Sequence, residues 1–457
     1  MTMKIASAVI WLAAMSTNIT GYAAELVKPN AAFEALDAEL LSVVNNATYP
    51  LASLSVLAVR EGKVVYQKQW GHRFIDVTTP ANSKHANEAT MYRIASISKL
   101  VTTLGVMKLV EDGRLKLDTD IGDYLGYRVR NPNFPNDKIT LRMLLTHRSS
   151  LRDDAGYYWD NKHQLKEVLV PGGMLYGKGA MWAKNAKPGT YFQYANLPWG
   201  VIGTVMERVS GERFDRLIAR LILNPMGLRG GFSPADMPCT DIQNIATLYR
   251  KRTEVNDKEI WNTAGPWVAQ VDDYSSTAPV PRAGPDYEIG SNGTLYGPQG
   301  NVRLSAADLG KLMLMLMNEG KHNGKQILKK ATVNSMLSEQ WHADGKNGES
   351  NFGGKELFFA WGLGNQHFLD KSGVGKGDRL VEAGGFTGVG HLGDAWGLTS
   401  AFVFNRSTRN GMIFLSGGPG FDLETYKGKY SAMYRYEEQI LDALYRRAIV
   451  GKAGIAQ

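Results

Sequence analysis

The chain has 457 residues, of which 44% are hydrophobic and 21% are charged, and this balance indicates a globular protein of two or three domain-sized units. A single cysteine, Cys239, excludes a framework of intramolecular disulfides. The net charge of +8 fits either a solvated basic surface or attraction to an anionic polymer or membrane surface. No block of Lys and Arg is interleaved with aromatic residues, so we expect no nucleic-acid partner.

The N-terminus has the pattern of a secretory signal peptide. Lys4 precedes an apolar run over residues 5–15, and small residues follow up to residue 24. The run is short for an uncleaved anchor, and no later segment is apolar over a length that spans a bilayer. We therefore expect a signal peptide over residues 1–24, a bacterial periplasmic or secreted location, and no integral membrane segment after cleavage.

The spacing of apolar residues and the positions of turn residues predict the elements in chain order. They are a helix over 29–46, strands over 53–59 and 63–70 joined at Glu61-Gly62, a polar loop over 71–90, a helix that begins near Ser96 and ends near 113, short helices between 114 and 200 that include Thr140 to Leu145, helices over 199–209 and 213–223, an irregular insertion over 229–290, a helix from Ser305 to Glu319, strands over 398–404 and 412–415, and a final helix over 430–449.

This order predicts a mixed α/β (α+β) fold in which an antiparallel sheet is flanked by helices. Both ends of the chain supply strands, so the sheet domain is discontinuous and comprises residues 25–125 and 295–450. A mostly helical domain is inserted over residues 126–294, and residues 451–457 form a tail. We find no internal repeat and no low-complexity segment.

The first candidate for chemistry is Ser96-x-x-Lys99 at the start of an apolar helix. Residues three apart share a helix face, so the two side chains lie side by side. A serine hydroxyl becomes a good nucleophile when a nearby base takes its proton. Lysine is such a base when burial or a second cation lowers its pKa. Alone the motif is weak, since about one or two matches are expected by chance in a chain of this length.

Two further candidates lie downstream. Tyr194-x-Asn196 follows a Pro-Gly turn, and a tyrosine hydroxyl acts as general acid or base when nearby cations lower its pKa. His391-x-Gly393 directly precedes the strand at 398, where small residues let a substrate backbone approach and the histidine supplies a cation or a hydrogen bond. Each alone is equally typical of an ordinary loop or turn.

Other chemistries fit the sequence poorly. Residues 388–393 match G-x-G-x-x-G, but no helix pattern follows them, so we reject dinucleotide binding and expect no cofactor. The eight histidines are scattered, and H-E-x-x-H, G-x-S-x-G and a complete P-loop are absent from the sequence, so we expect no metal site.

Taken in order, the three candidates resemble the motifs of the penicillin-recognising serine hydrolases, specifically the class C β-lactamase-like group. The motifs are Ser96-Ile97-Ser98-Lys99, Tyr194-Ala195-Asn196 and His391-Leu392-Gly393. The flanking segments 144–151, 188–194 and 297–305 are also similar to the group's, and the resemblance covers essentially the whole mature chain. It implies a β-lactamase/transpeptidase-like fold.

The resemblance also implies roles for these residues. Ser96 attacks a carbonyl and forms an acyl-enzyme, with Lys99 as its neighbouring base. Tyr194 protonates the leaving group and later orients the deacylating water, and Asn196 binds the substrate amide. The backbone N–H groups of Ser96 and Asp394 form the oxyanion hole.

The chain departs from the group at the substrate-binding motif. His391 stands where true β-lactamases have a carboxylate-binding lysine, and Asp394 occupies a position that is mostly small or polar. Its carboxylate either favours a substrate with a free amine or points to solvent.

Three functions follow from the resemblance. The first is a peptidase or amidase on D-amino-acid peptides, of the DD-carboxypeptidase or D-aminopeptidase type, with a small-molecule, peptide or cell-wall peptide substrate. The second is an esterase or weak β-lactamase, and the third is a non-hydrolytic penicillin-binding sensor that stays acylated.

Overall fold

A computed structural model of the chain describes residues 31–255 and 258–451. The predicted signal peptide lies outside the described residues, as does most of the predicted C-terminal tail. Within the described residues the main sheet has nine strands, all antiparallel to their neighbours, in the order β12-β15-β16-β17-β18-β19-β1-β2-β3. In that order they span Trp341–His342, Ala360–Trp361, Gln366–Phe368, Gly388–Ala395, Leu398–Asn405, Asn410–Ser416, Ser53–Arg60, Lys63–Phe74 and Lys84–His85.

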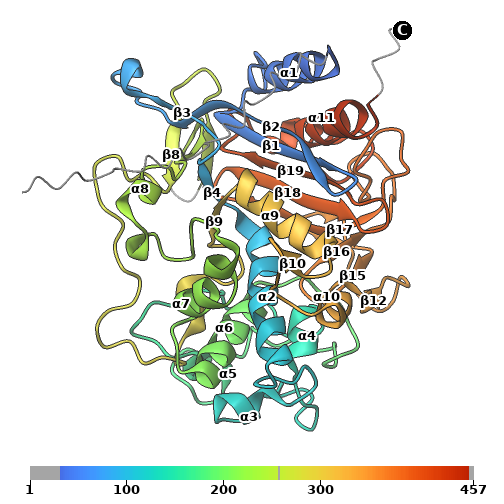
Figure 1. The fold of residues 1–457 in the computed structure, drawn as a ribbon. Coiled ribbons are helices and arrows are strands. Elements are labelled where there is room, and N and C mark those ends of the chain that lie inside the picture. The colour runs from blue at the N-terminus through green and yellow to red at the C-terminus, as the bar shows by residue number, and fades with distance from the viewer. Residues whose placement is uncertain (1–30, 256–257, 452–457) are drawn as a thin grey trace, which may run out of the picture.

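Helices cover both faces of this sheet (Figure 1). Helices α1 (Ala31–Val44) and α11 (Arg435–Ala443) pack on one face. Helices α2 (Ser98–Glu111) and α9 (Ala306–Met317) lie on the other. Strand β1 is buried on both faces along almost its whole length, which explains why its residues 56–59 are an unbroken apolar run instead of an alternating pattern. The prediction of an antiparallel sheet flanked by helices is confirmed.

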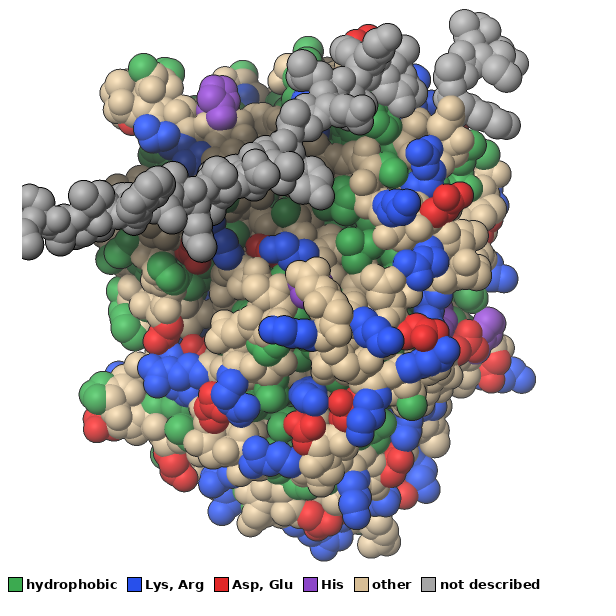
Figure 2. Space-filling view, viewed as in Figure 1, with side chains coloured by type: hydrophobic (Ala, Val, Ile, Leu, Met, Phe, Trp, Pro, Cys, Tyr) green, Lys and Arg blue, Asp and Glu red, His purple; other side chains and the backbone are tan. Residues whose placement is uncertain are grey.

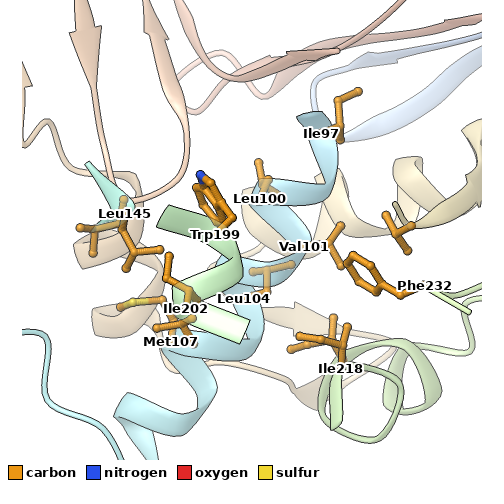
Figure 3. Close-up of a cluster of buried hydrophobic side chains, with 14 of the residues drawn as sticks. Ile97, Leu100, Val101, Leu104, Met107, Leu145, Trp199, Ile202, Ile218 and Phe232 are labelled. Atoms are coloured by element: carbon orange, nitrogen blue, oxygen red, sulfur yellow. The ribbon is translucent and has the colours of Figure 1, made fainter. Parts of the chain in front are cut away.

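Helix α2 runs from the sheet into a helical region below it (Figure 1). Leu100, Val101 and Leu104 are fully buried, and Trp199 and Phe232 belong to the same apolar cluster (Figure 3). Burying each of these large side chains contributes roughly 1.5–3 kcal/mol. The helix therefore has no freedom to shift, and the residues at its N-terminus are held in place beneath the sheet.

The helical region consists of short helices joined by loops. They are α3 (Ile121–Leu125), α4 (Leu141–Leu145), α5 (Leu165–Leu169), α6 (Leu197–Ser210), α7 (Phe214–Ile218) and α8 (Cys239–Ile242), and α10 (Lys330–Leu337) packs against α2. Helix α7 continues into a wider π-helical turn over Ala219–Leu223, and α11 does so over Leu444–Ile449. The domain boundaries at 125/126 and 294/295 stay predictions.

Several predicted elements are confirmed at their turns and caps. Glu61 and Gly62 both have positive φ, at 52° and 77°, as a tight two-residue hairpin turn requires. The Ser305 hydroxyl accepts a hydrogen bond from the Asp308 N–H and caps α9, and Thr140 caps α4 in the same way. The rejected dinucleotide motif lies in β17, a strand that continues through a hairpin into β18, so no helix follows the motif in the chain.

Other predictions were wrong. The loop expected over 71–90 contains the end of β2, which continues to Phe74 and pairs with β3. The segment 229–290 is not wholly irregular, since it holds the paired strands β5 (Leu248–Arg250) with β8 (Val268–Val271) and β6 (Arg252–Val255) with β7 (Lys258–Trp261). The last helix begins at Arg435 instead of residue 430, because hydrogen bonds to Glu438 fix the preceding residues as a loop.

The surface charge is mixed on the face shown in Figure 2. Lysine and arginine side chains alternate with aspartate and glutamate over the helical region of that face, without a single-sign patch. Among the residues that the structure describes, no helix is long and apolar enough to cross a membrane.

Candidate active site

Ser96 lies in a 3-10 turn, η2 (Ala95–Ile97), between a short strand and helix α2. Strand β4 (Met91–Arg93) pairs with β9 (Arg303–Ser305) and leads into the turn. Ala95 has a φ of 48°, a backbone conformation that residues other than glycine rarely adopt and that stores strain. The buried helix behind and the strand pair in front thus fix the position of the serine.

The Lys99 ammonium group lies directly beneath Ser96. Its Nζ is 3.0 Å from the Ser96 Oγ, 2.8 Å from the Asn196 Oδ1 and 3.1 Å from the carbonyl oxygen of Gln299. The side chain is fully buried, and burial lowers the pKa of Lys99 to about 7, although the nearby Asp153 raises it. Near neutral pH a large fraction of Lys99 is therefore an uncharged amine.

The partners of Lys99 determine where its lone pair points. The Asn196 Oδ1 and the Gln299 carbonyl only accept hydrogen bonds, so they take the two N–H groups of the neutral amine. The third direction leads to the Ser96 hydroxyl, which then donates to Nζ. The geometry thus gives Ser96 a base in hydrogen-bond contact.

Tyr194 is fixed by aromatic stacking. Its ring stacks on His147 at a centroid distance of 4.4 Å and on Phe358 at 4.9 Å, and it meets Trp361 edge-on. Burial raises the pKa of Tyr194, and a hydrogen bond with Ser96 only partly offsets this. The lowered pKa that a tyrosine base would require is not found here, because desolvation dominates. Tyr194 is therefore a protonated donor beside the nucleophile.

The Asn196 side chain, which we expected to bind the substrate amide, contacts Lys99 and Asp153 in the structure. Its Oδ1 accepts from Lys99, and its Nδ2 donates to Asp153 at 3.0 Å. The Asp153 carboxylate also accepts the backbone N–H groups of Asn196 and Leu197, at 2.8 and 2.9 Å, at the start of α6. Asn196 thus positions the lysine, and Asp153 positions Asn196.

His391 is neutral in this site. It is 3% exposed, and its Nδ1–H donates to the Leu392 carbonyl at 2.5 Å. Burial, reinforced by the Lys99 charge, lowers the pKa of His391 to about 3. Of the two alternatives, a cation or a hydrogen bond, the neutral imidazole leaves the hydrogen bond, because Nε2 has no partner among the described residues.

Gly393 lets strand β17 approach the nucleophile turn. A Cβ at this position would lie 2.7 Å from the Ile94 carbonyl oxygen and 2.4 Å from the Ser400 Oγ. Both distances are too short for real atoms, so only glycine permits this contact without a shift. Asp394 follows at the exposed end of the strand.

The predicted residues come together around one cavity of about 240 Å³. Ser96, Tyr194, His391, Gly393 and Asp394 line it. Lys99 and Asn196 lie behind Ser96 through the hydrogen bonds described above. The use of the Ser96 and Asp394 N–H groups as an oxyanion hole stays a prediction. The described part of the chain contains no group of three or more His, Cys, Asp or Glu side chains arranged to hold a metal ion.

Sequence reasoning missed several positioning residues. Asp153 lies in no motif, and Tyr194 is reached from far along the chain by Trp361 of β15 and by Phe358 in the segment just before that strand. His147 accepts the Ala195 N–H at 3.2 Å and stacks on Tyr194, and its place in the segment 144–151 was the available signal.

Comparisons with known proteins place the chain in a family. The family model described as Beta-lactamase matches residues 30–432. Protein flp of Staphylococcus aureus is 28% identical over 177 residues, which are 38% of this chain and 33% of that protein. A putative D-alanyl-D-alanine carboxypeptidase of Salmonella typhimurium is 25% identical over 250 residues, 48% of this chain and 56% of the relative. The chain thus spans about a third to about half of these relatives in the matched regions.

The fold is also similar to a solved structure. The D-amino acid amidase of Ochrobactrum anthropi in complex with D-phenylalanine superposes with a TM-score of 0.60 at 18% identity, and the match covers 91% of this chain and 99% of the amidase. This likeness confirms the β-lactamase/transpeptidase-like fold that the motifs predicted.

Proposed function

Because the chain belongs to the beta-lactamase family of serine hydrolases, we propose that it forms an acyl-enzyme at Ser96 and hydrolyses amides or short peptides of D-amino acids. The observation that carries the proposal is the contact between the Ser96 Oγ and the buried Lys99 Nζ at 3.0 Å, with Tyr194 hydrogen-bonded to the same serine. The D-configuration is supported by the names of the Salmonella relative and the Ochrobactrum amidase.

Acylation follows from the protonation states of the three side chains. The neutral Lys99 Nζ takes the Ser96 hydroxyl proton as Oγ bonds to the substrate carbonyl carbon. Tyr194 gives its proton to the leaving nitrogen as the C–N bond breaks, and the Lys99 ammonium passes the former serine proton to the tyrosinate, which leaves Lys99 neutral again. Water then attacks the acyl-enzyme while the lysine accepts its proton, which releases the acid and restores the Ser96 hydroxyl.

The state of His391 favours amides over substrates that require a bound carboxylate. A lysine at this position would be a fixed cation, whereas the neutral imidazole offers only an acceptor at Nε2. An acceptor pairs with a substrate N–H, not with a carboxylate oxygen. We therefore rank amidase or aminopeptidase activity above carboxypeptidase and β-lactamase activity.

A substrate panel tests the proposal. The compounds are D- and L-alanine p-nitroanilide, N-acetyl-D-alanyl-D-alanine, a short-chain p-nitrophenyl ester and a chromogenic cephalosporin, each assayed with wild type and Ser96→Ala. We expect the D-anilide to be hydrolysed faster than its L-isomer, and Ser96→Ala to lose about 10³-fold or more of this activity. Turnover that persists in Ser96→Ala, or a cephalosporin cleaved faster than the D-anilide, would contradict it. A covalent adduct of the cephalosporin that persists on Ser96 without turnover would indicate the non-hydrolytic penicillin-binding sensor.

We further propose that the protein is exported and meets cell-wall peptides, which rests on the signal pattern of residues 1–24. Expression of the full chain with cell fractionation and N-terminal sequencing of the product tests this. A cleaved product in the periplasm or medium is expected, and an uncleaved cytoplasmic protein would contradict it.

A further inference from the structure

The active-site cavity extends beyond the catalytic residues, around an open edge of the sheet. Strand β17 pairs with β16 only over Gly388–Gly390, so its residues 391–395 have no partner strand on that side among the described residues. Ser96 and Tyr194 line the cavity at one end. Its other wall contains Tyr434 and Glu437 at the start of α11, and Lys355 of strand β14 (Lys355–Glu356).

This second wall is acidic and aromatic. The charged residues that line the cavity are Asp394, Glu424, Glu437 and Lys355, three carboxylates and one ammonium group. The Lys355 Nζ lies 3.3 Å from the centroid of the Tyr434 ring. The wall thus already accommodates one cation of the protein itself, in the surroundings that ammonium groups prefer.

Some of these carboxylates are already engaged. The Glu437 carboxylate accepts the Tyr434 N–H at 2.8 Å, and Glu424 accepts from the Tyr434 hydroxyl at 3.4 Å. Lys427 lies 3.4 Å from Glu424 and compensates its charge at the rim. Glu424 is therefore the least available of the three.

Two acceptors remain uncommitted. Among the described residues, the Asp394 side chain has no hydrogen bond or ion pair within contact distance, with Lys355 and Arg250 as its nearby cations. His391 is 3% exposed, and its Nε2 has no partner. Both residues line the same cavity as Ser96, but Nε2 is a buried atom whereas Asp394 is exposed, so Asp394 is the acceptor that is open to a bound molecule.

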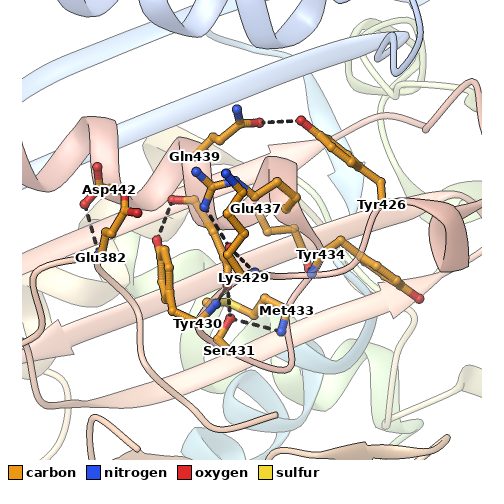
Figure 4. Close-up of polar contacts among 12 residues, drawn as sticks. Glu382, Tyr426, Lys429, Tyr430, Ser431, Met433, Tyr434, Glu437, Gln439 and Asp442 are labelled. Carbon is orange, nitrogen blue, oxygen red and sulfur yellow. Dashed lines mark hydrogen bonds and ion pairs between the residues drawn. The ribbon is translucent and has the colours of Figure 1, made fainter. Parts of the chain in front are cut away.

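The far wall is held rigidly by Glu438 of α11. Its carboxylate accepts the N–H groups of Lys429 and Tyr430 at 2.9 and 3.0 Å and the Ser431 hydroxyl at 2.8 Å, and it pairs with Arg435 at 2.9 Å. Figure 4 shows this network beside Tyr434 and Glu437. The wall is therefore formed before any ligand binds, which lowers the entropic cost of binding.

We propose that this wall is an ammonium-binding subsite, in which the uncommitted Asp394 carboxylate, with Glu437 adding negative charge beside it, holds a cationic amine of the molecule whose carbonyl group meets Ser96. The inference rests on the proposed function and narrows it to amides and peptides that carry a free amine near the scissile bond. Burial, more than the neighbouring Asp394, raises the pKa of Glu437 to about 7 against the opposing charge of Lys355. A bound cation favours the ionised form of this carboxyl group.

Binding to an inactive protein tests the subsite independently of turnover. Calorimetry on Ser96→Ala compares D-alaninamide, with a free α-amine, with N-acetyl-D-alaninamide, which is neutral, and with Nα-acetyl-D-lysinamide, which has only a side-chain amine. We expect D-alaninamide or Nα-acetyl-D-lysinamide to bind at least about tenfold more tightly than the neutral N-acetyl-D-alaninamide. The tighter of the two shows whether the subsite holds the α-amine or the side-chain amine of the substrate. Equal affinities, or tighter binding of the carboxylate N-acetyl-D-alanine, would overturn the proposal.

Charge variants in the same background assign the effect to the wall. Asp394→Asn is expected to reduce the preference for the amine about tenfold. Lys355→Met removes the competing cation and is expected to strengthen amine binding, which a merely destabilised site would not do. Glu319→Gln, an exposed carboxylate paired with Lys330 at the end of α9, is the control and is expected to change neither.

An amine preference that is unchanged in both Asp394→Asn and Lys355→Met would also overturn the subsite. Failure of the proposed function would instead appear as wild type that binds the amine but hydrolyses no D-amino-acid amide. Failure of the subsite and failure of the proposed function therefore give different results.

Discussion

Replacement of Asp153 by asparagine is expected to lower the pH at which the enzyme becomes active. Asp153 raises the pKa of Lys99 by its charge, and the two groups are linked through Asn196. Across one amide, roughly 7 Å, two unit charges at an effective dielectric of about 20 interact by about 2 kcal/mol. Partial exposure of Asp153 reduces this, so we expect a shift of about one pH unit.

The direction of this pH shift follows from the role of Lys99 as the base. Loss of the carboxylate destabilises the lysine ammonium, so the pKa of Lys99 falls from about 7 and the neutral amine persists at lower pH. The acid limb of the kcat/KM profile for D-alanine p-nitroanilide therefore moves down in Asp153→Asn. Asp154→Asn, at the exposed neighbour, is the matched control. An acid limb that stays in place or moves up would refute the role of Lys99 as the base, provided that thermal melts show both variants folded.

Three further substitutions test other parts of the site. Lys99→Met removes the base and should lower kcat/KM by about 10²–10⁴-fold with little change in Tm, and an active variant would contradict the role. His391→Lys restores a cation and should raise cleavage of a chromogenic cephalosporin relative to the D-anilide by about tenfold, and an unchanged ratio would mean that the histidine does not select against carboxylates. Gly393→Ala places a Cβ 2.4 Å from the Ser400 Oγ and should lower the free energy of unfolding by urea by about 1–3 kcal/mol. Gly231→Ala is the control, because no atom lies within 4 Å of the added Cβ, and this substitution should leave the free energy of unfolding unchanged.

The contact between Ser96 and Lys99 could be expected from the sequence because the two residues are close in the chain. Ser96 and Lys99 share one helix start, and the apolar run that buries them is visible in the sequence. The sheet with strands from both chain ends was also predictable, since β1, β18 and β19 are mostly apolar and the Glu61-Gly62 turn marks the hairpin from β1 to β2.

The rest depends on contacts between distant segments. Asp153 reaches Lys99 only through Asn196, and no local pattern marks it. The protonation states of Tyr194 and His391 could not be derived from the sequence, because burial, which a sequence does not display, is the largest cause of both pKa shifts. The short strands β12, β15 and β16 were missed because two or three residues carry no periodicity.

The central claim is that Ser96 becomes acylated with Lys99 as its base, and peptide mapping of the trapped intermediate tests it most directly. Wild type is mixed with a D-alanine active ester, quenched in acid, digested and analysed by mass spectrometry. We expect the acyl group on the peptide that contains Ser96, no adduct in Ser96→Ala, and a much slower rise of the adduct in Lys99→Met. An acyl group on another peptide, or the same rate of acylation in Lys99→Met, would contradict the account.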